Sequence, residues 1–153
     1  MKKRMLSALL LVLMLCCAAA AQGETAYAAV SGLPVLREAA AGAQKLGSLR
    51  AGARVTVHYD GGGWARLQLG EVTGYVEADG LSAAAPAGEP SSGTVASPYG
   101  TPTVVLRSRP SNSYGAAGVL ETGAQVRVLG EFGGFYGVDS PAGTGFLAKD
   151  EVK

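Results

Sequence analysis

The sequence has very little cysteine and histidine, and this limits the chemistry open to it. Its two cysteines, Cys16 and Cys17, lie close to the N terminus, and His58 is its single histidine. Residues 22–153 therefore have no disulfide, no thiolate nucleophile and no cysteine-based zinc site. A Cys–His or Ser–His peptidase needs a base that a third group orients, and one histidine does not supply this arrangement. We predict no catalytic residues, no metal and no cofactor.

The sequence also lacks an excess of charge of either sign. It contains 13 Lys and Arg against 12 Asp and Glu. The acidic residues mostly lie in predicted turns or beside basic residues, which indicates a solvated surface and not the carboxylate pair of a glycosidase. No window concentrates Lys and Arg. Because nucleic-acid binding requires a basic face, we predict that nucleic acid is not a partner.

Long hydrophobic runs are missing except at the N terminus. Three basic residues are followed by an apolar run over residues 5–17 and then by four alanines that end at Ala21. This order is typical of a secretory signal peptide, which we expect to be cleaved after Ala21 or, as a second position, after Ala28. The predicted location is therefore secreted or in the cell envelope, outside the cytoplasmic membrane.

Two alternatives would instead attach the protein to a membrane. The apolar N-terminal segment is at the short edge of a membrane span, so it is also compatible with an uncleaved anchor. Lipidation of Cys16 or Cys17 is the other alternative, although the bulky Leu15 fits a lipoprotein signal poorly.

The remaining sequence repeats itself. Gly47–Leu81 aligns without a gap to Gly118–Val152 at a constant offset of 71 residues, and 11 of the 35 positions are identical. A repeat of this length indicates one fold unit used twice. Residues shared by the two copies are expected mostly to build the fold, and residues that differ are freer to select a ligand. We predict domains at residues 29–81 and 101–153.

Residues 82–100 separate the two copies. This segment is rich in Ala, Ser, Gly and Pro and has almost no large apolar side chains. Such a composition cannot bury a core, so we expect a flexible, partly extended linker without regular structure.

Each copy has the pattern of short strands and turns. Residues 54–59 alternate polar and apolar side chains, as in a half-buried strand. Residues 60–63 include three glycines that suit a tight hairpin, and residues 64–69 form the returning strand. No window shows a sustained helical period. About fifty residues with four or five short strands predict a small, strongly bent barrel, so the expected fold is all-β.

The ordered motifs of both copies resemble the bacterial SH3-like (SH3b) domain. Each copy has Leu-Arg and a polar loop, then Gly-x-Leu-x-x-Gly, then Gly-Gly-aromatic, then Thr-Gly-aromatic-aliphatic. There are departures: Ala65 stands where the family usually has an aromatic residue, and Phe135 replaces the tryptophan of the first copy, Trp64. The resemblance implies two small SH3-like β-barrels joined by the linker, and the departures imply that the copies need not bind the same ligand.

The same resemblance implies the function of a binding module. We expect an exported, non-enzymatic protein that binds peptidoglycan or an envelope peptide through paired weak sites, whose linkage raises avidity. The alternative is a protein–protein interaction module that regulates a separately encoded envelope or wall enzyme. A third interpretation is a membrane-held stress or signalling protein that keeps its N-terminal segment.

Aromatic side chains are the first candidates for ligand contact. By strand parity, Trp64 and Arg66 lie on the opposite face from Leu67, and Phe135 lies on the opposite face from Tyr136. We therefore predict Trp64, Arg66, Phe135 and Tyr136 as ligand-binding residues. The alternative is that loops cover Trp64 and bury it in a second small core.

Two arginines, Arg37 and Arg107, follow the leucine of the first motif in each copy and are taken as equivalent. A salt bridge or loop clamp is the favoured role, and binding of a ligand carboxylate is the other. If Trp64 belongs to the core, the binding site is expected in the loops at residues 37–45 and 107–117.

Overall fold

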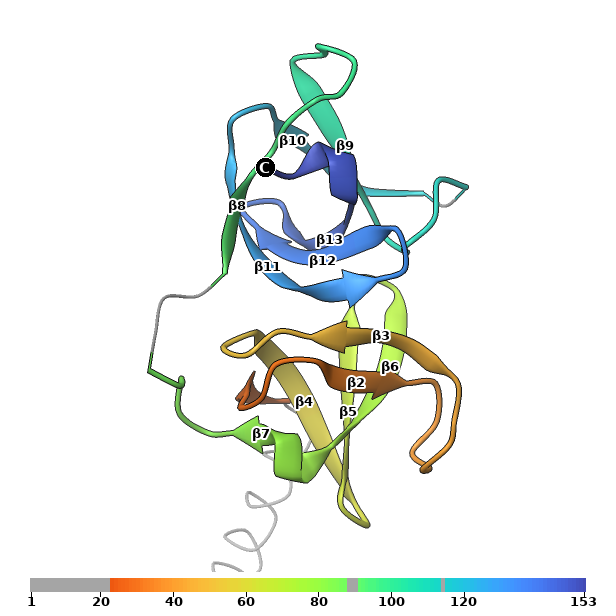
Figure 1. The fold of residues 1–153 in the computed structure, drawn as a ribbon. Helices are drawn as coiled ribbons and strands as arrows, with labels where there is room; N and C mark the ends of the chain where they lie inside the picture. Colours follow the sequence, from red (N-terminus) through yellow and green to blue (C-terminus); the bar gives the residue numbers. More distant parts are fainter. Residues whose placement is uncertain (1–22, 88–90, 114) are drawn as a thin grey trace, which may run out of the picture.

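The computed structural model describes residues 23–87, 91–113 and 115–153. The predicted signal peptide therefore lies outside the described residues. The described chain is all-β, as the sequence predicts, with thirteen strands and two short 3-10 turns (Figure 1). None of its helical segments is both long and apolar enough to cross a membrane.

The strands form two sets with the same order of elements. The strands of repeat one are β1 (Glu24–Ala28), β2 (Leu33–Leu36), β3 (Lys45–Leu49), β4 (Arg54–Gly61), β5 (Trp64–Leu69), β6 (Val72–Glu77) and β7 (Leu81–Ser82). The strands of repeat two are β8 (Ser92–Thr94), β9 (Thr103–Arg107), β10 (Ala116–Glu121), β11 (Gln125–Phe132), β12 (Phe135–Ser140) and β13 (Gly143–Ala148). A 3-10 turn follows the β6 strand at Ala78–Gly80, and another follows β13 at Lys149–Glu151.

The alternating pattern in the sequence corresponds to the burial of alternate side chains. Val55 and Val57 on β4 are buried, and their polar neighbours are exposed or half-buried. The tight β4–β5 turn uses three consecutive glycines, Gly61, Gly62 and Gly63, at φ of 87°, 67° and 83°. Side chains with a Cβ rarely adopt this left-handed backbone, which explains the glycine run.

All thirteen strands belong to one open sheet. Twelve of them follow in the order β10-β9-β13-β12-β11-β3-β2-β6-β5-β4-β1-β7, and β8 pairs with β11 beside this path. Within each repeat the order is the same, so the prediction of two SH3-like units is confirmed. The sheet is not closed, and β11 of repeat two pairs with β3 of repeat one, so that the repeats stack end to end (Figure 1).

The segment between the repeats differs from the predicted linker of residues 82–100. Its second half contains β8, and the following Val95 is only 1% exposed. β8 pairs with β11 as β1 pairs with β4, so both strands open their repeat. The 71-residue offset does not extend to these two strands. Arg54 and Gln125 correspond at that offset, but the residues opposite them, Tyr27 and Thr94, do not. The connection between β7 and β8 is therefore shorter than the composition suggests.

Two hydrophobic clusters fill the molecule, and one of them crosses the boundary between the repeats. The second cluster lies wholly in repeat two and includes Leu106, Val138 and Leu147. The first cluster holds the core of repeat one together with Leu129 and two phenylalanines of repeat two. The interior of repeat one is therefore completed by side chains from its neighbour.

Candidate binding surfaces

The contact between the repeats is apolar at its centre. Leu129, Phe132 and Phe146 of repeat two are each 2% exposed or less and belong to the core of repeat one. The rings of Phe132 and Phe146 meet edge to face, with centroids 5.3 Å apart and an interplanar angle of 78°. This is a favoured geometry for aromatic pairs.

Backbone hydrogen bonds hold the same contact. The Arg50 N–H donates to the Leu129 carbonyl at 2.8 Å, next to the β3–β11 pairing of Leu49 with Gly130. A Cβ at Gly130 would overlap the Ser48 carbonyl oxygen and lie 2.9 Å from the Leu49 Cα. Only glycine therefore permits this approach of the two strands.

Charged side chains surround Tyr136 at the edge of the contact between the repeats. Arg50 lies 3.3 Å from Glu131, donates to the Ser91 hydroxyl at 2.8 Å, and lies over the Tyr136 ring at 5.1 Å. Lys149 lies 3.2 Å from Glu131 and 5.6 Å from the centre of the same ring. The hydrogen bond from Lys149, followed by the one from Arg50, lowers the pKa of Glu131 below its ordinary value.

The interface uses a sheet face that repeat one leaves open. At the 71-residue offset, Leu129 and Phe146 correspond to His58 and Tyr75. Both repeat-two residues are buried, whereas His58 and Tyr75 are only half-buried. Among the residues that the structure describes, the same face is thus apolar and buried in repeat two but amphipathic and only half-buried in repeat one.

The open face of repeat one gathers aromatic and hydrogen-bonding groups. His58, Arg66 and Tyr75 lie opposite one another across β4, β5 and β6. Trp64 is half-buried on the same face, which is opposite the buried Leu67, so the predicted parity holds. Arg66 is exposed and lies 3.6 Å from the Asp60 carboxylate.

A shallow polar hollow lies on this face. Its volume is about 450 Å³, and its side walls present hydroxyl, imidazole, guanidinium and amide groups. Its polar lining residues are Thr56, His58, Arg66, Gln68 and Thr73 of repeat one and Thr144 of repeat two. Half-buried aromatics beside such donors and acceptors suit a sugar or a peptide, since aromatic rings supply rigid contact area and polar groups supply orientation.

The aromatic candidates of repeat two are placed differently. Phe135 is half-buried and packs against the core that the two repeats share. Tyr136 is also half-buried, packs against the second cluster, and carries Arg50 and Lys149 over its ring. The structure therefore does not bring Phe135 and Tyr136 together with Trp64 and Arg66 at one site.

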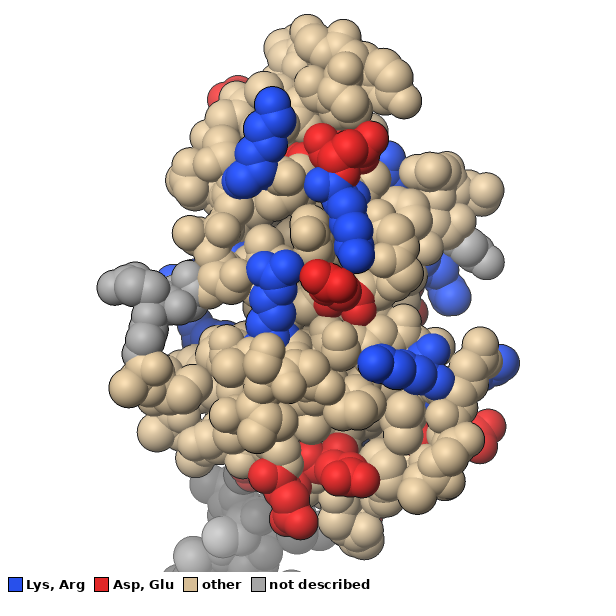
Figure 2. Space-filling model, in the orientation of Figure 1, with Lys and Arg blue, Asp and Glu red and all other residues tan. Residues whose placement is uncertain are grey.

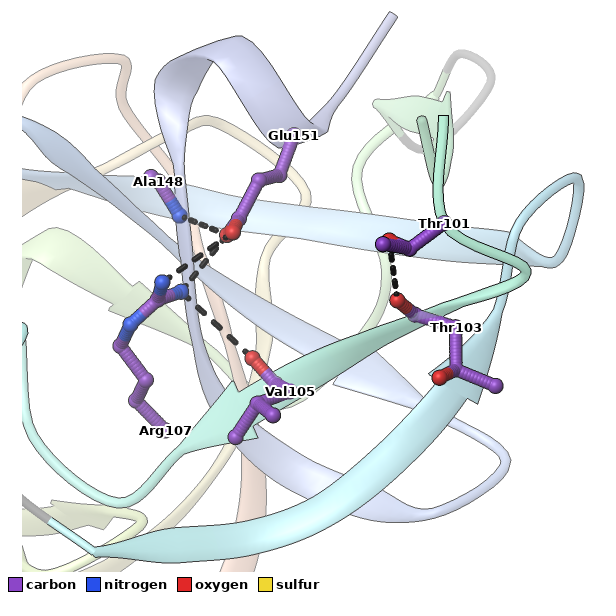
Figure 3. A network of polar contacts seen from close by, with 6 residues as sticks. All are labelled: Thr101, Thr103, Val105, Arg107, Ala148 and Glu151. Carbon is purple, nitrogen blue, oxygen red and sulfur yellow. Dashed lines mark hydrogen bonds and ion pairs between the residues drawn. The ribbon is translucent and has the colours of Figure 1, made fainter. Parts of the chain in front are cut away.

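Arg107 is held in an ion pair inside repeat two (Figure 3). It donates to both carboxylate oxygens of Glu151, at 2.6 and 3.1 Å, and this carboxylate also accepts the Ala148 N–H at 2.8 Å. The Arg107 and Glu151 side chains are only 15% and 10% exposed, and the guanidinium lies 5.6 Å from the Phe135 ring centre. This is the salt bridge that the sequence favoured for Arg107.

The expected equivalence of Arg37 and Arg107 is wrong. Arg107 lies opposite Phe146, and the residue opposite the corresponding Tyr75 is Leu36. The 71-residue offset therefore continues through this strand, and the counterpart of Arg37 is Ser108. In the two equivalent strands, Leu36 and Leu106 stand one position apart and therefore face opposite sides. The shared Leu-Arg sequence does not mark equivalent positions.

The two loops predicted as the alternative binding site lie next to each other. Residues of both loops, 37–45 and 107–117, line one groove between the repeats, with Arg37 on its rim. Elsewhere basic and acidic side chains alternate on the face shown in Figure 2, and neither sign forms a continuous patch. Among the residues that the structure describes, no group of three or more His, Cys, Asp or Glu is placed to hold a metal ion.

The strand order and the doubled core define an all-β protein made of two SH3-like repeats. The model of the bacterial SH3 domain matches residues 31–82 and 102–153, so the chain belongs to the bacterial SH3 domain family. A search of curated protein sequences found no match.

Two solved structures match this chain at low sequence identity. NlpC1 from Trichomonas vaginalis is 15% identical, with a TM-score of 0.41, over 89% of this chain and 47% of that chain. NlpC2 from the same organism is 14% identical, with a TM-score of 0.40, over 88% of this chain and 48% of that chain. The chain thus spans about half the length of these two proteins.

Proposed function

We propose that this protein is an exported, non-enzymatic binding module that holds cell-wall peptidoglycan or an envelope peptide on the open face of repeat one. The observation that supports this proposal is the contrast between the two copies. Repeat two buries this face under its neighbour, whereas repeat one leaves Trp64, Arg66 and Tyr75 accessible on it. A half-buried tryptophan beside hydrogen-bonding groups offers a sugar or a peptide rigid apolar contact area together with polar partners.

The paired weak sites expected from the repeat are not equivalent in this proposal. Phe135 and Phe146, the counterparts of Trp64 and Tyr75, contact the core of repeat one. Any second site must therefore have a different chemistry from the first.

The fold of repeat one also bears on export. β1 pairs with both β4 and β7, and its Ala26 and Ala28 are at most 1% exposed. Cleavage after Ala28 would remove this strand, so the proposal places the signal-peptide cleavage after Ala21.

Co-sedimentation with purified, washed cell-wall sacculi tests the proposal. Trp64→Ala is expected to weaken binding about 10-fold or more, because loss of a stacked aromatic costs on the order of 1–3 kcal/mol. Tyr99→Ala is the matched control, since Tyr99 is 86% exposed and belongs to the segment between β8 and β9 of repeat two. Trp64→Phe, which places the repeat-two aromatic at this position, checks that the effect is not a loss of folding.

Failure of the wild-type protein to sediment with sacculi would refute peptidoglycan as the ligand of this face. An unchanged affinity of Trp64→Ala on the folded fraction would remove Trp64 from the site. The proposal also requires that the purified protein releases no product from sacculi.

The free edge of repeat two favours the second candidate, a module that binds an envelope protein. Among the described strands, β10 pairs only with β9, and Val105 and Val119, which lie opposite each other, are 45% and 58% exposed. An unpaired apolar edge is suited to strand addition by another chain. Retention of one specific protein from envelope extract, lost in Val119→Lys, would support this alternative.

A further inference from the structure

The β2–β3 loop of repeat one and the β9–β10 loop of repeat two meet at a groove between the repeats. Its volume is about 560 Å³. Repeat one contributes Arg37, Gln44, Leu46, Glu71, Val72 and Thr73, and repeat two contributes Arg109, Pro110, Ser111 and Phe132. Neither repeat contains this groove by itself.

Close packing of a turn of repeat one against repeat two sets the width of the groove. The Glu71 N–H donates to the Ser108 carbonyl at 2.9 Å, and the Arg109 guanidinium lies 3.5 Å from the Glu71 carboxylate. Gly70 has a φ of 57°, and a Cβ there would lie 2.6 Å from the Ser108 oxygen. The groove therefore depends on a specific backbone contact and not on side chains alone.

The groove has an apolar base and a polar rim. Leu46 and Val72 are half-buried against the shared core, and Phe132 is 2% exposed. Arg37, Gln44, Arg109 and Ser111 surround them. Such a site accommodates a small apolar side chain below and a polar group at the rim.

The charge of the rim indicates which polar group fits. Glu71 and Arg109 form an ion pair, so their charges largely compensate each other. Arg37 is exposed and donates to the Gln44 side-chain oxygen at 3.4 Å, and it forms no ion pair with a carboxylate among residues 23–87, 91–113 and 115–153. The rim thus has one positive charge whose partner is a neutral amide. A carboxylate matches the planar guanidinium with two parallel hydrogen bonds.

We infer that this groove binds the C-terminal carboxylate of a short peptide whose last residues are small and apolar. The carboxylate accepts from Arg37, and the preceding side chains contact the base formed by Leu46 and Val72. This site is separate from the open face of repeat one and does not depend on the function proposed there.

The test is an NMR titration of the purified protein with N-acetyl-Ala-Ala that has a free carboxylate, compared with its C-terminal amide. The free acid is expected to shift the backbone amides of Gln44, Leu46, Thr73 and Ser111. It should bind at least about 10-fold more tightly than the amide, because a charge-assisted pair is lost in the amide.

Substitutions test whether the peptide binds at the groove and not elsewhere on the molecule. Arg37→Gln should weaken binding of the free acid by about 10-fold or more, and Arg37→Lys by less, because lysine keeps the charge but not the planar pair of donors. Arg54→Gln is the matched control, since Arg54 is an exposed arginine of the same repeat outside the groove. Arg37 is exposed, so its variants should keep the wild-type melting temperature.

Three results would overturn the inference: equal binding of acid and amide, wild-type affinity of Arg37→Gln, or no shifts at the groove with either peptide. Trp64→Ala should bind the peptide as wild type does. A failure of sacculus binding with intact peptide binding would therefore reject only the function proposed for the open face.

Discussion

Gly130 tests whether the two repeats form one folding unit. It lies on β11 where this strand meets β3 of repeat one, and it is buried. A Cβ at this position overlaps the Ser48 carbonyl and approaches the Leu49 Cα, both of which are backbone atoms. Since backbone cannot rotate away as a side chain can, Gly130→Ala should push β3 and β11 apart.

Gly134→Ala is the matched control. Gly134 is in the turn that follows β11, and a Cβ there would meet no atom within 4 Å. Both substitutions restrict the unfolded chain similarly, a gain of about 0.4–1 kcal/mol. The difference between the two variants therefore isolates the steric effect.

We expect Gly130→Ala to lower the free energy of unfolding by about 1–3 kcal/mol relative to Gly134→Ala, as in overpacked cores. Separation of the repeats limits the strain but exposes Leu129, Phe132 and Phe146. Each of these side chains is worth roughly 1.5–3 kcal/mol when fully buried, so separation does not restore the lost stability.

Urea unfolding gives the stability difference, and hydrogen exchange locates it. The Arg50 and Glu71 amides donate across the junction, to Leu129 and Ser108. Their protection should fall in Gly130→Ala and persist in Gly134→Ala. Stabilities equal to within about 0.5 kcal/mol, with unchanged protection of both amides, would refute the idea that the repeats are joined through β3 and β11.

Three further predictions concern the ion pairs and the first strand. Arg107→Leu should cost about 3 kcal/mol in urea unfolding because Glu151 is left buried without its partner, and adding Glu151→Gln should recover part of this loss. Because the folded pKa of Glu131 is lowered, its contribution is fully present above the ordinary value of 4.5 and is lost as the pH falls below it. The stability difference between wild type and Glu131→Gln should accordingly shrink in acid, and a constant difference would contradict the roles of Lys149 and Arg50. Mass spectrometry of the native protein should find a chain that retains β1, and a form that lacks β1 should melt at a clearly lower temperature.

Much of each strand could be predicted because strand alternation is a local property. The pattern of Val55 and Val57 on β4 and the glycine run after it determined a hairpin with one buried face. The parity of Trp64 and Arg66 followed from the same alternation. The strands β1 and β8 were not predicted, since they lie outside the repeated segment and β8 has few large side chains to mark it.

The sequence by itself therefore determined the all-β class, the two copies and the faces of their strands. These depend on spacing and side-chain type within a few residues. Only the tertiary structure decided that Phe146 and Leu129 cover repeat one while Tyr75 and His58 stay open, and that Arg37 lies at a groove while Arg107 is paired with Glu151. These outcomes depend on how β11 approaches β3, a contact between strands far apart in the chain. No periodic pattern in the sequence predicts that contact. It depends on the space that the missing side chain of Gly130 leaves and on the apolar area that packing of the two repeats removes from water.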